Sequence, residues 1–158
     1  MSILLPVDIA SPAQLSELIT QLHTYRNQLR DAAVQAKVKK TRLIAPELSN
    51  ELVNLLHNNK ADPGDSAQLE LLHKELQKVL TTAPVVHITL AANPGRTLRR
   101  QLTVWFRTQI EQTSLLTFAV RSDIGGGLLL QAGSHFYDYS FRDRILANKS
   151  RLMEIANV

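Results

Sequence analysis

The chain has 158 residues, 44% of them hydrophobic and 20% charged, an ordinary composition for one globular domain or two small ones. No stretch approaches the roughly 18 consecutive apolar residues that a membrane-spanning helix needs. The first residues lack the basic and apolar regions of a signal or transit peptide. Because the chain has no cysteine, disulfides, zinc–thiolate sites and thiol catalysis are excluded.

The composition changes near residue 83. Residues 1–83 carry nine basic and nine acidic residues, whereas 84–158 carry nine and five, so the net charge of +4 lies in the second stretch. Five of the six glycines and seven of the eight aromatic residues also follow residue 83. We therefore expect a helical region over 1–83 and a small α+β domain over 84–158. The positive charge favours an acidic partner, whether a protein, a nucleic acid or a membrane surface.

About three helices are expected in the helical region, and the first is long. Ser11, Pro12 and Gln14 form a helix start, because Ser is a good N-cap, Pro suits the first helical position and Gln can close a capping box. Two shorter helices follow, the first beginning near Pro46 and covering 47–59, the second covering 66–81.

The first helix carries an apolar seam with steps of three and four residues, as in a coiled coil. The seam is narrow, which suits one partner helix better than burial in a large core. We therefore expect part of it to be exposed in the isolated chain or paired with another chain. The alternative is an ordinary amphipathic helix in a local bundle. The candidate partner-binding residues of the seam are Leu15, Leu18, Leu22, Tyr25 and Leu29.

After Pro84 the pattern changes to alternating apolar and polar residues, which predicts strands. The expected order is strand, helix, strand, strand, strand, helix, with a curved sheet covered by helices on one face. The spans are 86–91, 94–112, 115–120, 128–131 and 135–139, followed by a last helix that Ser140 caps and that runs through Ile155.

No catalytic, cofactor-binding or metal-binding residue is assigned. The five histidines have no carboxylate or second histidine at metal-ligand spacing, and no hydrolase, zincin or phosphate-loop motif is present. The turn at 93–96 precedes a helix but lacks the glycines of a diphosphate site. Residues 125–127 precede a strand instead of a helix, so the three glycines indicate a bend or a close backbone approach.

Three arginines lie on one face of the expected helix 94–112, namely Arg96, Arg100 and Arg107. They form either a solvated face or a contact for an acidic protein. Nucleic acid is disfavoured as a partner, because Trp105 and Phe106 lie on the apolar stripe of the same helix and are expected in the core.

The stretch 123–146 reads DIGGGLLLQAGSHFYDYSFRDRIL. It resembles the C-terminal signature of the ATP synthase delta subunit, a family homologous to the mitochondrial oligomycin-sensitivity-conferring protein. That signature has a glycine pair before an apolar strand, a hairpin glycine, Asp-x-Ser and a basic residue before a Leu-like position. The matching residues here are Gly126, Gly127, Gly133, Asp138, Ser140 and Arg144.

The signature residues are expected to be architectural. Gly133 permits the positive φ of a tight turn. Asp138 and Ser140 lie where a strand ends and a helix begins, and their side chains can accept hydrogen bonds from free backbone amides there. The resemblance implies a non-catalytic, cofactor-free stator subunit that links the peripheral stalk to the catalytic head. Its partners would be other ATP synthase subunits, on the cytoplasmic face of the membrane or the equivalent organellar face.

Residues 1–83 depart from this family, whose N-terminal region is a six-helix bundle of roughly one hundred residues; here that region is reduced or divergent. Two alternatives remain open. One is the E-type peripheral stalk subunit of archaeal-type and vacuolar-type rotary ATPases, which joins a long N-terminal helix to a small α+β domain. The other is a small basic RNA-binding or ribosome-associated domain, for which retention on RNA would depend steeply on salt.

Overall fold

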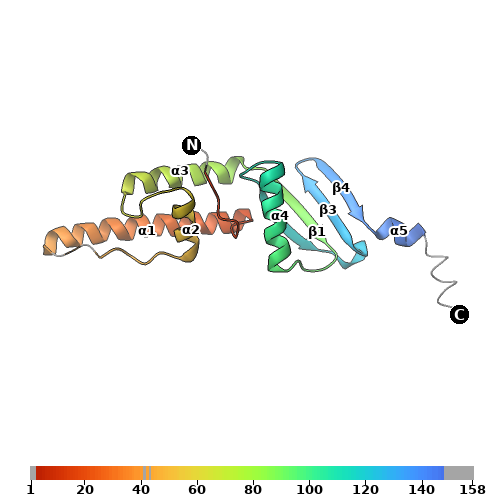
Figure 1. The fold of residues 1–158 in the computed structure, drawn as a ribbon, viewed down its shortest axis with the longest axis horizontal. Coiled ribbons are helices and arrows are strands. Elements are labelled where there is room, and N and C mark those ends of the chain that lie inside the picture. Colours follow the sequence, from red (N-terminus) through yellow and green to blue (C-terminus); the bar gives the residue numbers. More distant parts are fainter. Residues whose placement is uncertain (1–2, 41, 43, 148–158) are drawn as a thin grey trace.

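The computed structural model describes residues 3–40, 42 and 44–147. A helical region and a small α+β domain lie end to end along the long axis of the molecule (Figure 1). The fold class and the order of the elements in the second region agree with the sequence prediction. The last expected helix is described as far as Ala147, and its expected continuation through Ile155 lies outside the described residues. The helices are α1 (Pro12–Lys39), α2 (Asn50–Asn58), α3 (Ser66–Thr82), α4 (Arg96–Gln109) and α5 (Arg142–Ala147), with a 3-10 turn η1 at Ser122–Ile124; the strands are β1 (Val85–Leu90), β2 (Leu115–Val120), β3 (Gly127–Ala132) and β4 (His135–Ser140).

Short polar side chains fix where α1 and α3 begin. Ser11 Oγ accepts a hydrogen bond from the amide of Gln14 at 3.3 Å, and Gln14 Oε1 accepts from the amide of Ser11 at 3.0 Å. This reciprocal pair is the capping box that the sequence predicts. Asp65 caps α3 by accepting hydrogen bonds from the amides of Ala67 and Gln68.

Two helices begin later than the sequence pattern suggested. α2 begins at Asn50 instead of near Pro46, because Ser49 is its N-cap and accepts a hydrogen bond from the amide of Leu52. α4 begins at Arg96, with Gly95 as its N-cap, so Pro94 lies before the helix and not in its first turn. In both cases a proline lies before the helix: Pro46 is four positions before Asn50, and Pro94 is two positions before Arg96.

The apolar seam of α1 lies inside the helical region. All five seam residues are at most 7% exposed, and they belong to one buried cluster with leucines of α2 and α3. α1 packs mainly against α3, which runs beside it in the opposite direction (Figure 1). The expectation of an exposed or externally paired seam is therefore wrong. The corrected residues are Leu15, Leu18, Leu22, Tyr25 and Leu29, all of them core.

An N-terminal segment, residues 3–10, completes this core. Ile3, Leu5 and Ile9 are buried in the same cluster as the seam. The segment then reaches the sheet, where the amide of Leu116 donates a hydrogen bond to the carbonyl of Ala10 at 2.7 Å. Since Leu115 of β2 also belongs to the helical cluster, the two regions share buried contacts.

The sheet has four strands in the order β2-β1-β3-β4. β1 and β2 are parallel, joined through α4, whereas β3 is antiparallel to both β1 and β4. α4 packs on one face of the sheet, where Phe106 forms a second buried cluster with Val86, Ile88 and Leu116. The first cluster thus lies mostly before residue 83 but includes Leu115, whereas the second cluster lies entirely after residue 83.

Candidate functional site

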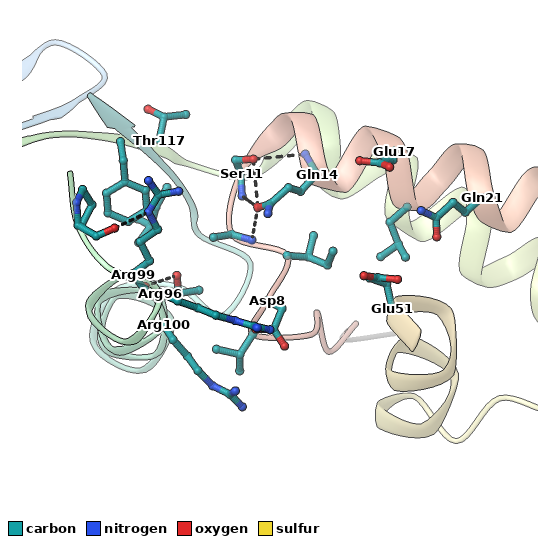
Figure 2. Close-up of a pocket in the computed structure, with 18 residues that line it drawn as sticks. Asp8, Ser11, Gln14, Glu17, Gln21, Glu51, Arg96, Arg99, Arg100 and Thr117 are labelled. Carbon is teal, nitrogen blue, oxygen red and sulfur yellow. Dashed lines mark hydrogen bonds and ion pairs between the residues drawn. The ribbon is translucent and has the colours of Figure 1, made fainter. Parts of the chain in front are cut away.

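A cleft of about 770 Å³ lies between the helical region and the α+β domain. One wall is formed by the N-terminal segment together with α1 and α2, and the other by the start of α4 and by β2 (Figure 2). Its floor is apolar, formed in part by Leu18 and Leu116. A concave surface between two bodies is the usual place for a ligand or a partner to bind, so we examined its charges in detail.

Arginines of α4 give one wall of the cleft its positive charge. The Arg96 side chain is 87% exposed and lies 3.6 Å from Asp8 in a loose ion pair, which at such exposure contributes little to stability. Arg100 is exposed and makes no hydrogen bond or ion pair with a described residue. These two sequence-predicted residues are therefore close together and accessible.

Arg99, which the sequence analysis passed over, also lines the cleft. Its Nε donates to the carbonyl of Pro94 at 3.0 Å and an Nη to Asn93 Oδ1 at 2.6 Å. Its guanidinium also lies 5.4 Å from the centre of the Phe118 ring, a cation–π arrangement. Because these contacts engage Arg99 locally, it shapes the turn before α4 more than it offers charge to a partner.

The third predicted arginine, Arg107, is engaged inside the molecule. Its guanidinium donates to the carbonyls of Pro6 at 3.0 Å and Ile9 at 2.6 Å, and more weakly to those of Leu5 and Ser114 at 3.3 Å each. Burial lowers the pKa of Arg107 to about 10, which leaves it charged at neutral pH. Arg107 is thus not a partner-binding residue: it ties α4 to the N-terminal segment.

The opposite wall carries carboxylates, from Glu17 of α1 and Glu51 of α2, with Asp8 between the two walls. Figure 2 shows Glu17 and Glu51 across the cleft from Arg96 and Arg100, and Asp8 beside Arg96. A surface with both signs of charge suits a partner that presents complementary charges, since such pairs fix orientation more than they add affinity.

The histidines of the described residues lie apart from any metal-binding cluster. Among the described residues, no three His, Asp or Glu side chains gather at metal-binding distance. His23 and His73 lie with ring centres 5.8 Å apart on α1 and α3, and burial, with help from Arg26, lowers the pKa of His73. His87 is hydrogen-bonded to Thr117 across the sheet. None of these histidines is paired with a carboxylate and a nucleophile.

The signature residues lie together at the β3–β4 hairpin and its ends. Gly126 and Gly127 have φ of +130° and +75°, and Gly133 has φ of +57° in the tight turn. A Cβ on Gly127 would lie 2.2 Å from the carbonyl oxygen of Tyr139. Asp138 Oδ1 accepts from the amide of Ser140 at 2.8 Å. The side chain of Arg144 lies outside the described part of the structure, although its backbone belongs to α5.

In these contacts the three glycines hold positive φ and the Asp138 carboxylate accepts from the Ser140 amide, and a purely architectural role for the whole set stays a prediction. Hydrogen bonds from the Asp138–Ser140 turn lower the pKa of the Asp138 carboxyl, with Ser140 as the main cause. Sequence reasoning missed Asp8 and the whole segment 3–10. The run of apolar residues at 3–7 was the available signal for a buried, non-helical segment.

No family model matches the chain, and no match was found among curated proteins. In the part of the chain that the structure describes, none of the helices is both long and apolar enough to cross a membrane.

Proposed function

We propose that this protein is a non-catalytic peripheral-stalk subunit of a rotary ATP synthase, which links the stalk to the catalytic head so that the head does not turn with the rotor. The observation that carries the proposal is the hairpin at 126–140. Among the residues that resemble the delta-subunit signature, the three glycines hold positive φ, inside a domain of the order β-α-β-β-β-α.

A second feature supports a mechanical role. A stator must transmit force between two binding surfaces, which requires that its own parts do not move freely against each other. Here the helical region and the α+β domain are joined by the N-terminal segment, which Arg107 holds through backbone carbonyls and which Leu116 holds through Ala10. The hydrogen bonds from the Arg107 guanidinium are charge-assisted, and such bonds are among the stronger polar contacts in proteins.

The proposal assigns partner contacts to the accessible part of the cleft. Arg96 and Arg100 would face an acidic segment of a neighbouring subunit, while Glu17 and Glu51 would face a basic one. The protein would then be peripheral on the cytoplasmic face of the membrane, or the equivalent organellar face, held there by its partners.

The test is purification of the full chain with an affinity tag from native membranes in mild detergent, followed by identification of the companions. We expect subunits of an F-type ATP synthase. Recovery of archaeal-type catalytic subunits would instead favour the E-type stalk subunit. RNA or ribosomal proteins, released steeply as salt rises, would favour the nucleic-acid alternative.

A charge-reversed variant sharpens this experiment. Arg96→Glu with Arg100→Glu should lose companions that depend on the cleft, because like charges would then oppose the acidic partner. Arg30→Glu with Lys78→Glu is the matched control, since both residues are exposed, neither lines the cleft, and neither forms an ion pair with a described residue. Equal loss of companions in both variants would count against a role for the cleft.

A further inference from the structure

The two edge strands of the sheet differ in how far they are covered. In the order β2-β1-β3-β4, the edges are β2 and β4. The N-terminal segment covers part of the β2 edge, where the amide of Leu116 donates a hydrogen bond to the carbonyl of Ala10. β4 lies on the side of the sheet away from the helical region (Figure 1), and all its residues except Ser140 are exposed. Among the described residues, β4 is therefore the open edge.

The hydrogen-bond register shows which backbone groups of β4 face outward. The amide of Phe141, just after β4, donates to the carbonyl of Gly126, just before β3, at 3.1 Å. In an antiparallel ladder every second residue bonds to the neighbouring strand, so the odd-numbered residues of β4 bond to β3. The even-numbered residues direct their amides and carbonyls away from β3. Phe136 and Asp138 therefore present backbone donors and acceptors at the open edge.

The side chains of β4 do not protect this edge. Natural edge strands are protected by lysine, proline, a bulge or an inward-pointing charge. β4 reads HFYDYS, which contains neither lysine nor proline, and its six residues pair one to one with those of β3. Its acidic side chain, Asp138, accepts a hydrogen bond from the amide of Ser140 at 2.8 Å and so turns along its own strand. The edge can therefore accept another strand.

One face of β4 carries a row of aromatic rings. His135, Tyr137 and Tyr139 occupy alternate positions of the strand and so share one side of the sheet. Neighbouring ring centres in this row are 6.5 Å apart, and the two tyrosine rings are nearly parallel, at 11°. The tyrosines are 49% and 60% exposed. Because aromatic cross-strand pairs stabilise a sheet, an added strand with aromatic residues at alternate positions would fit this edge.

We propose that β4 pairs with β4 of a second copy of this chain, antiparallel and with Tyr137 on the two-fold axis, so that the two sheets become one. A two-fold contact uses the same surface twice, so the second copy supplies the aromatic row that the edge fits. Tyr137 then faces Tyr137 of the second copy, and Tyr139 faces His135 of the second copy. The outward backbone groups of Phe136 and Asp138 form about four hydrogen bonds, two for each directly opposite pair.

Charge and length favour this register over its neighbours. An axis at Asp138 would place the two carboxylates directly opposite each other, which is unfavourable. An axis at Phe136 would place Tyr139 opposite Gly133 of the turn, where it has no aromatic partner. An axis at Tyr137 pairs residues 135–139 completely and separates the two carboxylates. It therefore combines the most aromatic pairs with no opposed like charges.

The first test is the oligomeric state of the full chain. Sedimentation velocity is measured from roughly 1 to 200 µM, a range chosen because a contact through one strand is small and therefore weak. We expect a monomer–dimer equilibrium with a dissociation constant on the order of tens of micromolar. A chain that remains monomeric throughout this range would overturn the proposal.

Charge variants at the proposed axis test the contact itself. Tyr137→Lys and Tyr137→Glu each put like charges opposite each other, so each alone should dimerise about tenfold more weakly or worse. An equimolar mixture should recover the dimer, because the introduced ammonium then faces the introduced carboxylate. Val120→Lys and Val120→Glu are the matched controls at an exposed position of the β2 edge, and each alone should dimerise like the unmodified chain. Failure of the mixture to recover the dimer, or equal weakening by the Val120 variants, would contradict pairing through β4.

Cysteine variants test the register, because the chain has no native cysteine. In the proposed dimer the two copies of position 137 form a non-hydrogen-bonded pair with Cα atoms about 4.5 Å apart, within the reach of a disulfide. Tyr137→Cys should therefore give a covalent dimer under mild oxidation. Tyr139→Cys is the matched control on the same face, because the two copies of position 139 would lie four residues out of register, roughly 13 Å along the strand.

Absence of the covalent dimer from Tyr137→Cys, or equal yields from Tyr137→Cys and Tyr139→Cys, would overturn the proposed pairing. The inference concerns the chain alone and does not depend on the proposed function.

Discussion

Gly127 and Gly133 both require glycine, but for different physical reasons. Gly133 has φ of +57° in the hairpin turn and nothing within 4 Å of where a Cβ would be, so only its backbone conformation opposes a side chain. Gly127 has φ of +75°, and a Cβ there would collide with the backbone of Tyr139 on the neighbouring strand. Substitutions should therefore separate conformational strain from steric overlap.

We predict that Gly127→Ala destabilises the protein by about 3 kcal/mol or more, since a positive φ and a backbone clash add together. Gly133→Ala should cost only about 1–2 kcal/mol, the penalty of a left-handed conformation, and Gly133→Asn less. Gly133→Val should cost about 1–3 kcal/mol. Chemical denaturation of each full-length variant measures these losses. Equal losses at positions 127 and 133 would show that the hairpin relaxes away from the close approach.

At the scale of single residues, the sequence predicts hydrogen bonds between neighbouring residues well and hydrogen bonds between distant residues poorly. Ser11 and Gln14 are three residues apart, so their capping box can be read from the pattern. Arg107 finds its acceptors about one hundred residues away, at Pro6 and Ile9. Its position on the same helix face as Arg96 and Arg100 gave no sign that its guanidinium is buried.

At the scale of elements, α1 shows what an apolar pattern can and cannot specify. The spacing of its leucines correctly identified the face that is buried. It did not identify what covers that face, because a narrow seam looks the same whether the cover is another chain or two short helices. The missing cover comes partly from Ile3, Leu5 and Ile9, residues that have no helical pattern of their own.

We predict that Leu18→Ser with Leu22→Ser unfolds the helical region instead of selectively weakening partner binding. Both leucines are at most 1% exposed, and each change removes buried methyl groups and buries a hydroxyl, at a cost of about 3 kcal/mol or more per site. Thermal unfolding followed by far-UV circular dichroism should show a large loss. Val34→Ser with Val38→Ser, at exposed positions of the same helix, should change little.

The opposite outcome would restore the seam as a docking surface. If the Leu18 and Leu22 variant kept its melting temperature while companions were lost from the membrane preparation, α1 would have to open to bind them. The seam would then pack in the core of the closed state and bind the partner in the open state.

At the scale of the whole molecule, the sequence predicts two regions but not how they are joined. The change of composition near residue 83 falls between α3 and β1, and each region has its own buried cluster. Independent folding of residues 84–158 stays a prediction. In that fragment Arg107 would lose the carbonyls of the N-terminal segment, and Leu115 would lose the helical cluster. No local pattern reveals such contacts, because they join the first residues of the chain to its middle.

The contact between Arg107 and the N-terminal segment leads to a prediction about how rigidly the two regions are held together. Arg107→Met keeps the length of the side chain but removes the charged donor. The carbonyls of Leu5 and Ile9 then lose Arg107 as their donor, whereas the carbonyl of Pro6 keeps the amide of Ile9. Loss of hydrogen bonds from a charged group should cost about 2–4 kcal/mol, and part of that cost can be relieved if the N-terminal segment detaches. Detachment would free the α+β domain to move against the helices. Arg107→Lys should recover only part of the effect, because an ammonium cannot reach several carbonyls at once as a guanidinium does.

Distance distributions between two spin labels can measure this motion. Val34→Cys on α1 and Phe136→Cys on β4 are exposed positions at opposite ends of the molecule, in a chain without native cysteine. We expect a narrow distribution in the otherwise unmodified chain and a broad one after Arg107→Met. Arg100→Met, which removes an exposed arginine of the same helix, should leave the distribution narrow. A narrow distribution in the Arg107 variant would mean that Leu115 and the helical core hold the two regions without the N-terminal segment, and the stiffness that a stator needs would have to be attributed to those contacts.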